Sequence, residues 1–225
     1  MKQGAYFHNC QYYNDPISKE NQTFKQEYIQ YYEKLPVTHT KFLLIDPAPT
    51  ANADSDFTGW GVVCLDEDMN VYVDLAGQIK KEPGDLVQWI FDMHKTWAFD
   101  AIFIEEVSFS KVFQSWAMQK SSQEGEFLPI LPVKVGNKNK EARIRAIQPY
   151  YQAKKVFHSK KCEPVLLDQL LRFPAIKKDD VIDAISFFPL VCYPPAKAKK
   201  QEKDYRGKVC LPDFNKARTK PIWFM

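Results

Sequence analysis

The sequence predicts an α/β fold in which helices flank a mixed β-sheet, and three observations support this class. Three apolar runs follow one another between residues 41 and 76, separated only by short polar turns. Strands this close in sequence pair antiparallel, because a parallel pair needs a long crossover. Helical and extended patterns then alternate to residue 190, which is typical of strands added in parallel. The composition, 45% hydrophobic and 26% charged, is that of a globular domain.

The first three strands form the predicted antiparallel meander. Lys41–Asp46 is an apolar run that ends in a carboxylate, and Pro47 and Pro49 mark the turn that follows it. Thr58–Leu65 is apolar throughout, although its two glycines weaken it as a strand. Val71–Ala76 comes after a polar loop and alternates apolar and polar side chains.

The remaining elements alternate between helix and strand. In order, we expect a helix over Asp85–Trp97, a strand over Ala101–Glu105, a helix over Phe109–Gln119, an extended segment over Leu128–Val133, a basic helix over Glu141–Tyr150, a strand at Val156–Phe157, and helices over Pro164–Phe173 and Val181–Leu190. The prolines of the extended segment suit an edge strand. Asp179 or Asp180 is expected to cap the last helix.

Three regions follow from this pattern. Residues 1–36 are Tyr-rich and polar without strong periodicity, and we expect a connecting arm that packs on the domain. Residues 37–193 form the α/β domain. Residues 194–225 form a basic tail whose apolar tip, Pro221–Met225, either docks on the domain or binds a partner.

Several classes of protein are disfavoured by the composition. Five scattered cysteines without a CxxC pair argue against a disulfide framework or a zinc site and suit a reducing compartment. The four histidines show no HExxH spacing, which argues against zinc and a Ser-His-Asp triad. Neither a signal peptide nor a long apolar stretch is visible, so we expect an intracellular protein without a membrane span. The phosphate-binding pattern GxxxxGK[ST] of ATPases is absent from the sequence.

The charge is unevenly distributed, although the formal net charge is only +3. Residues 134–161 hold nine basic residues and one acidic residue, and the tail is also basic. An acidic body beside basic segments suits an enzyme that holds divalent cations in one place and a polyanion in another. A solvated lysine-rich surface is the alternative, and charge alone does not decide between them.

Carboxylates recur at the ends of the predicted elements. Asp46 and Glu105 each end an apolar strand, and Asp179 and Asp180 open the last helix. Taken singly, Asp46 could form a turn and Asp180 could be a helix cap. Together they supply the hard oxygen ligands that Mg²⁺ or Mn²⁺ prefers. Two such ions can activate a water and stabilise the leaving oxygen of a phosphodiester.

Six blocks of the sequence carry a resemblance to a known family. They are Phe7–Pro16, Ile45–Ala48, Asp56–Gly59, Ile104–Glu106, Lys140–Arg143 and Lys178–Ala184. On these blocks the chain resembles the nuclease domain of tailed-phage large terminases, which has a ribonuclease-H-like fold. Lys178 stands where relatives usually have His, a change that removes an imidazole but no metal ligand.

The resemblance implies a ribonuclease-H-like mixed sheet and a catalytic set of Asp46, Glu105 and Asp180. Asp46 would bridge two Mg²⁺ or Mn²⁺ ions, and the other two would each hold one. Asp179 and Asp183 would be supporting acids, although Asp183 could equally lie on the helix surface. Asp56 would match an accessory acid of some relatives. Glu106 should point away from Glu105, to the opposite face of the sheet.

The resemblance also implies a substrate and partners. The substrate would be double-stranded concatemeric DNA, cut when packaging begins and ends, with phosphate contacts from Lys138, Lys140, Arg143 and Arg145. The full-length protein would add an ATPase domain and bind the portal protein and the small terminase subunit, in the bacterial host cytoplasm on the prohead. The alternatives are a DNA-binding and portal-docking module without activity of its own, and a resolvase or ribonuclease H relative.

Overall fold

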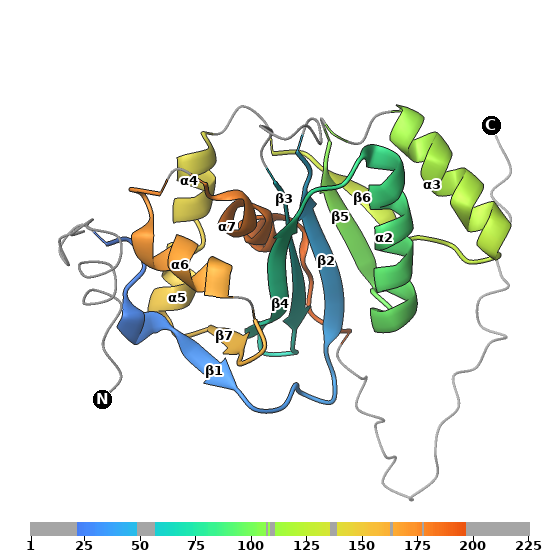
Figure 1. The fold of residues 1–225 in the computed structure, drawn as a ribbon. Coiled ribbons are helices and arrows are strands. Elements are labelled where there is room, and N and C mark those ends of the chain that lie inside the picture. The colour runs from blue at the N-terminus through green and yellow to red at the C-terminus, as the bar shows by residue number, and fades with distance from the viewer. Residues whose placement is uncertain are drawn as a thin grey trace, which may run out of the picture. The chain divides into compact units, whose positions relative to one another are not determined.

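The computed structural model describes residues 22–48, 57–106, 108, 111–135, 139–162, 164–176 and 178–196. The chain divides into two units, Met1–Pro195 and Ala196–Met225, and the helices and strands of the described residues lie in the first. They form a mixed sheet of seven strands in the order β1-β7-β4-β3-β2-β5-β6, with helices on both faces (Figure 1). Among the described residues, no helix is long and apolar enough to cross a membrane.

The bounds of the elements are as follows. The strands are β1 (Gln30–Tyr32), β2 (Thr40–Asp46), β3 (Thr58–Leu65), β4 (Val71–Ile79), β5 (Ala101–Glu105), β6 (Ile130–Val133) and β7 (Val156–Ser159). The helices are the 3₁₀ turn η2 (Gln26–Tyr28), α2 (Pro83–Trp97), α3 (Lys111–Glu124), α4 (Lys140–Arg145), α5 (Gln148–Gln152), α6 (Pro164–Arg172), α7 (Asp180–Ile185) and α8 (Phe188–Val191).

The predicted sheet is confirmed. β2, β3 and β4 form an antiparallel meander, and β5, β6 and β7 are added to it in parallel. β6 is an edge strand, which suits its Pro132 because an edge residue does not need a backbone N–H for the sheet.

The segment predicted as a connecting arm also contributes to the sheet. β1 pairs in parallel with β7 at the other edge. Phe24, just before it, is fully buried, with its ring centroid 5.2 Å from that of Tyr151 and 6.0 Å from that of Phe173. A strand of three residues is too short to show an alternating pattern, so the sequence gives no sign of it.

Two helices predicted as continuous are each divided in two. The predicted helix over Glu141–Tyr150 is α4 followed by α5, and the one over Val181–Leu190 is α7 followed by α8. A proline stands in the first turn of α5 and of α8. Proline lacks the N–H that would continue a helix and clashes with the preceding turn, but fits the first turn of a new one.

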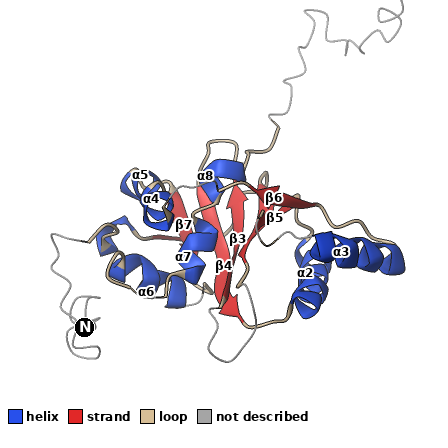
Figure 2. Cartoon of the chain, turned by 90° about the horizontal axis from the view of Figure 1, so that it is seen from above, coloured by secondary structure: helices blue, strands red, loops and turns tan. Residues whose placement is uncertain are grey.

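Each face of the sheet carries its own apolar core. Ile45, Trp60 and Ile104 pack on one face with residues of α2 and α3. Leu44 and Phe103 point to the other face and pack with residues of α4 to α8. The two groups of helices lie on opposite sides of the strands (Figure 1 and Figure 2). We refer to the second face as the α7 face.

Candidate active site

Asp46 and Glu105 end two neighbouring parallel strands. In the register of β2 and β5, Ile45 is paired with Ile104, so the two acids follow at the same level. Because side chains alternate along a strand and both isoleucines face α2 and α3, Asp46 and Glu105 are directed to the α7 face. The sequence prediction that these two acids meet is therefore supported by the register.

Asp180 reaches the same place through a close contact between α7 and β3. Gly59 of β3 is paired with Asp46 of β2. A Cβ atom on Gly59 would lie 1.9 Å from the backbone oxygen of Asp180, and one on Gly61 would lie 2.2 Å from Cδ1 of Ile185. The two glycines, which the sequence suggested only as a weakness of the strand, thus let α7 rest directly on the sheet, with its first turn over Gly59 beside Asp46.

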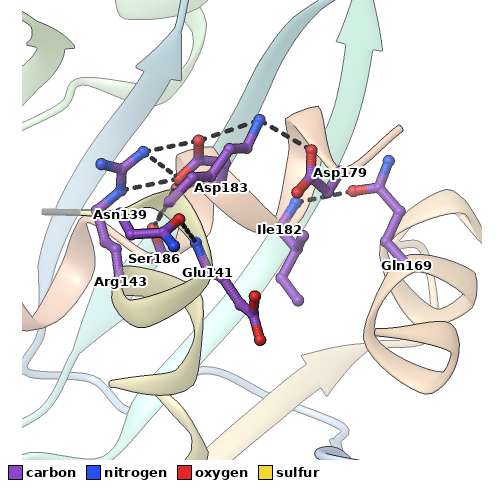
Figure 3. Close-up of polar contacts among 9 residues, drawn as sticks. Asn139, Glu141, Arg143, Gln169, Asp179, Ile182, Asp183 and Ser186 are labelled. Atoms are coloured by element: carbon purple, nitrogen blue, oxygen red, sulfur yellow. Dashed lines mark hydrogen bonds and ion pairs between the residues drawn. The ribbon is translucent and has the colours of Figure 1, made fainter. Parts of the chain in front are cut away.

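The first turn of α7 is capped by another helix. Asp179 is the N-cap residue but makes no side-chain capping hydrogen bond. The backbone N–H of Ile182 instead donates to Oε1 of the buried Gln169 of α6, at 2.9 Å (Figure 3). Asp179 thus stands at the predicted N-cap position, but the side-chain capping bond that the sequence implied is made by Gln169 instead. The carboxylate of Asp179 is available for other contacts.

Asp46 lies in an environment that disfavours its charge. Burial and the negative charges of Asp183 and Glu105 together raise the pKa of Asp46 to about 8, although the positive charges of Lys140 and Arg143 oppose the shift. Clustered carboxylates of this kind need positive charge nearby. A divalent cation beside Asp46 would supply it.

Asp183 is bound by basic side chains of α4. It is almost fully buried, and the Arg143 guanidinium donates from Nε to Oδ1 (2.9 Å) and from Nη2 to both carboxylate oxygens (2.6 and 2.7 Å). The Ser186 hydroxyl lies 3.2 Å from Oδ1. Asp183 therefore does not lie on the helix surface, one of the two alternatives left open by the sequence. It holds α4 against α7 (Figure 3).

The prediction that Arg143 contacts DNA phosphates is corrected by this geometry. Its side chain is 8% exposed and its guanidinium lies over the Phe187 ring, 5.4 Å from the centroid. A buried cation paired with a carboxylate in this way is part of the interior.

Lys140, one turn before Arg143, lies among the acids. Its Nζ is 2.8 Å from Oδ1 of Asp179 and 3.2 Å from Oδ2 of Asp183. Burial lowers the pKa of Lys140, but the charges of Asp183, Asp179 and Asp46 outweigh burial and raise the pKa above its usual value. The ammonium therefore stays protonated and compensates the acids.

The other predicted residues are placed as follows. Asp56, Lys138, Phe7–Pro16 and the tip Pro221–Met225 lie outside the described residues. Arg145 is exposed and donates to Glu141 at 2.8 Å and to Thr23 at 3.1 Å. Glu106 forms an ion pair with Lys134 at 3.7 Å.

The donor set fits a hard divalent cation by its chemistry. Asp46, Glu105 and Asp180 offer carboxylate oxygens, the ligands of Mg²⁺ and Mn²⁺, from one end of the sheet. Within the described ranges, no three His, Cys, Asp or Glu side chains converge closely enough to form a ready metal-binding group. Lys140 and Arg143 offset part of the negative charge of the acids, but the pKa of Asp46 stays raised.

Comparison with known proteins places the fold of the chain in a known architecture. No family model and no curated protein sequence matches the chain. Among solved structures, the human cytomegalovirus terminase nuclease domain has a TM-score of 0.54 and 14% identity, covering 76% of this chain and 95% of that one. A manganese-soaked, inhibitor-bound form of that domain gives the same values. The P22 large terminase nuclease domain has a TM-score of 0.51 and 17% identity, covering 75% and 90%. The chain therefore has the ribonuclease-H-like fold of terminase nuclease domains.

Proposed function

We propose that this chain is the nuclease of a DNA-packaging terminase, a metal-dependent endonuclease that cuts double-stranded concatemeric DNA at the start and end of packaging. One observation carries the proposal. Asp46, Glu105 and Asp180 come from three separate elements and are brought to one end and one face of the sheet. The fold that carries these three acids is the one found in terminase nuclease domains.

In this proposal, Asp46, Glu105 and Asp180 would hold two Mg²⁺ or Mn²⁺ ions, with Asp179 and Asp56 as accessory acids. When bound, the ions would supply the charge that activates a water molecule and stabilises the leaving 3′ oxygen. The chain itself fixes the acids: Gly59 lets α7 approach β3 closely, and Gln169 fixes the first turn of α7. One similar structure, the cytomegalovirus domain, is described as manganese-soaked, which agrees with this choice of ion.

DNA would be positioned by basic side chains outside the acid cluster. Arg145 is exposed, and with Lys138 it is our candidate for phosphate contacts that carry no sequence information. In a full-length protein we expect an ATPase domain, the portal protein and the small terminase subunit as partners, on the prohead in the bacterial cytoplasm.

The test is cleavage of supercoiled plasmid by the chain in EDTA, Mg²⁺ or Mn²⁺. We expect nicking and linearisation only with metal, and loss of at least about 100-fold in rate for D46N and D180N, because each would remove a metal ligand. D92N is the matched control, since Asp92 is on α2 and bonded only to groups of its own helix in the described structure. Equal cleavage by D46N and wild type would refute the assignment.

One observation favours the alternative of a DNA-binding and docking module. Protein cations already offset part of the charge of the acids, and no group of three convergent ligands is present in the described ranges. Such a module would shift DNA in a mobility assay with and without metal and would leave plasmid intact under all conditions. Metal-dependent cutting by the wild type excludes it.

A further inference from the structure

The ammonium of Lys140 lies where positive charge is most needed. It contacts Asp179 and Asp183 at 2.8 and 3.2 Å, and its charge also acts on Asp46. The proposed function assigns Asp46 and the first turn of α7 to divalent metal ions. A protein cation and a metal ion would therefore draw on the same negative charge.

The position of Lys140 is set by the residues around it in α4. The Asn139 side chain accepts a hydrogen bond from the N–H of Glu141 and so starts the helix. Arg143 lies on the same side of the helix as Lys140, because residues three apart are neighbours. Its buried pairing with Asp183 fixes α4 against α7 (Figure 3). Lys140 therefore projects over the acids from an anchored turn.

Lys140 and Arg143 differ in their freedom to move. Arg143 is buried, and its guanidinium makes several hydrogen bonds to the carboxylate of Asp183. The Lys140 side chain is 38% exposed and ends in a single ammonium on a flexible stem. Lys140 can thus leave the acids for solvent by rotating its own side chain, while Arg143 cannot leave without opening the interface between α4 and α7.

We propose that Lys140 is an internal counter-cation of the acid site, whose ammonium, held beside the ligands by Asp179 and Asp183, competes with divalent metal ions for the negative charge of the site and thereby sets the metal concentration at which the site fills. This rests on the proposed function, since it takes the acids to be metal ligands. Without metal, the ammonium offsets the repulsion between the acids. When metal binds, the ammonium must either move away from the acids or stay and be repelled by the positive metal ion. Either effect weakens metal binding.

The test is titration of the full chain with Mn²⁺, followed by calorimetry, and melting of the same samples with and without Mn²⁺. We expect K140M to bind Mn²⁺ about tenfold more tightly than wild type, a change of about 1.4 kcal/mol. Without metal, we also expect K140M to melt at a lower temperature than wild type. On addition of Mn²⁺, its melting temperature should rise more than that of wild type. K140Q serves the same purpose if K140M does not fold.

Two further variants separate competition from a general effect of charge. R145M removes the same charge from the same helix, but Arg145 contacts Glu141 and Thr23, so its Mn²⁺ affinity should stay within about twofold of wild type. K140R keeps the cation and should not bind Mn²⁺ more tightly than wild type.

The outcomes distinguish this inference from the function on which it rests. Wild type that binds Mn²⁺, with K140M binding equally or more weakly, overturns the competition and leaves the nuclease proposal standing. An increase in Mn²⁺ affinity in R145M equal to that in K140M also overturns the competition, because the effect would then come from overall charge. Wild type that binds no Mn²⁺ overturns both.

Discussion

At the scale of single residues, the buried pair of Arg143 and Asp183 is the strongest electrostatic contact near the site. Three hydrogen bonds of 2.6 to 2.9 Å join two almost fully buried side chains. A charge buried in this way depends on its partner, since removing one member leaves the other uncompensated in a medium of low dielectric constant.

R143M should therefore lower the free energy of unfolding by about 3–5 kcal/mol, because it leaves Asp183 buried with less compensation. Urea denaturation followed by circular dichroism measures this. R145M, which removes an exposed guanidinium from the same helix, should change it by less than about 1 kcal/mol. Equal losses in the two variants would contradict the role given to the buried pair.

His158 on β7 is a second buried ionisable residue, away from the acids. It is fully buried, and neither ring nitrogen has a hydrogen-bond partner among the described residues. Burial lowers the pKa of His158 to about 4, below the usual value near 6.5. The unfolded chain therefore binds this proton more readily than the folded one. The free energy of unfolding consequently decreases as pH falls from about 6.5 to 4.

H158F should remove this acid sensitivity while it keeps an aromatic ring beside Tyr31 and Tyr151. Between pH 7 and pH 4, its free energy of unfolding should fall by about 3 kcal/mol less than that of wild type. Urea titrations at a series of pH values give the difference. Parallel curves for the two proteins would show that His158 does not titrate on unfolding in this range.

At the scale of elements, the site depends on how closely α7 approaches β3. Gly59 and Gly61 lie on the same face of β3 and remove the two Cβ atoms that would hold the helix away. Capping by Gln169 keeps the first turn of α7 regular without using the carboxylates of Asp179 or Asp180. The geometry of the acids is thus set by neighbours that carry no charge.

G59A should displace the first turn of α7, because its methyl group would meet the backbone of Asp180 at 1.9 Å. We expect a loss of about 2–4 kcal/mol in unfolding free energy and loss of metal-dependent cleavage in any folded protein. G84A is the matched control: a Cβ there meets nothing within 4 Å in the first turn of α2, so it should stabilise by up to about 1 kcal/mol. A G59A protein with wild-type stability and cleavage would exclude this account of α7.

At the scale of the whole molecule, the sequence predicts the sheet better than the contacts around the site. The meander and the strand-end positions of Asp46 and Glu105 follow from apolar runs and short turns, which are local signals. The cap from Gln169 and the burial of Arg143 depend on packing between segments distant in sequence. The sequence pattern of a basic helix is the same whether its cations face water or a buried carboxylate, so the pattern does not reveal the burial of Arg143. The sequence does not indicate β1, because a strand of three residues is too short to show an alternation of apolar and polar side chains.

The two sides of the acid site differ in how they are held in place. Asp46 and Glu105 end strands with buried cores on both faces, and such strands are among the last parts of a protein to open. Lys140 and Arg143 lie on a helix of six residues, too short to persist without its tertiary contacts. A brief local opening of α4 would carry both cations away from the acids and leave the sheet intact. The charge around Asp46 can therefore change within the lifetime of the folded state, without any change in the position of its backbone.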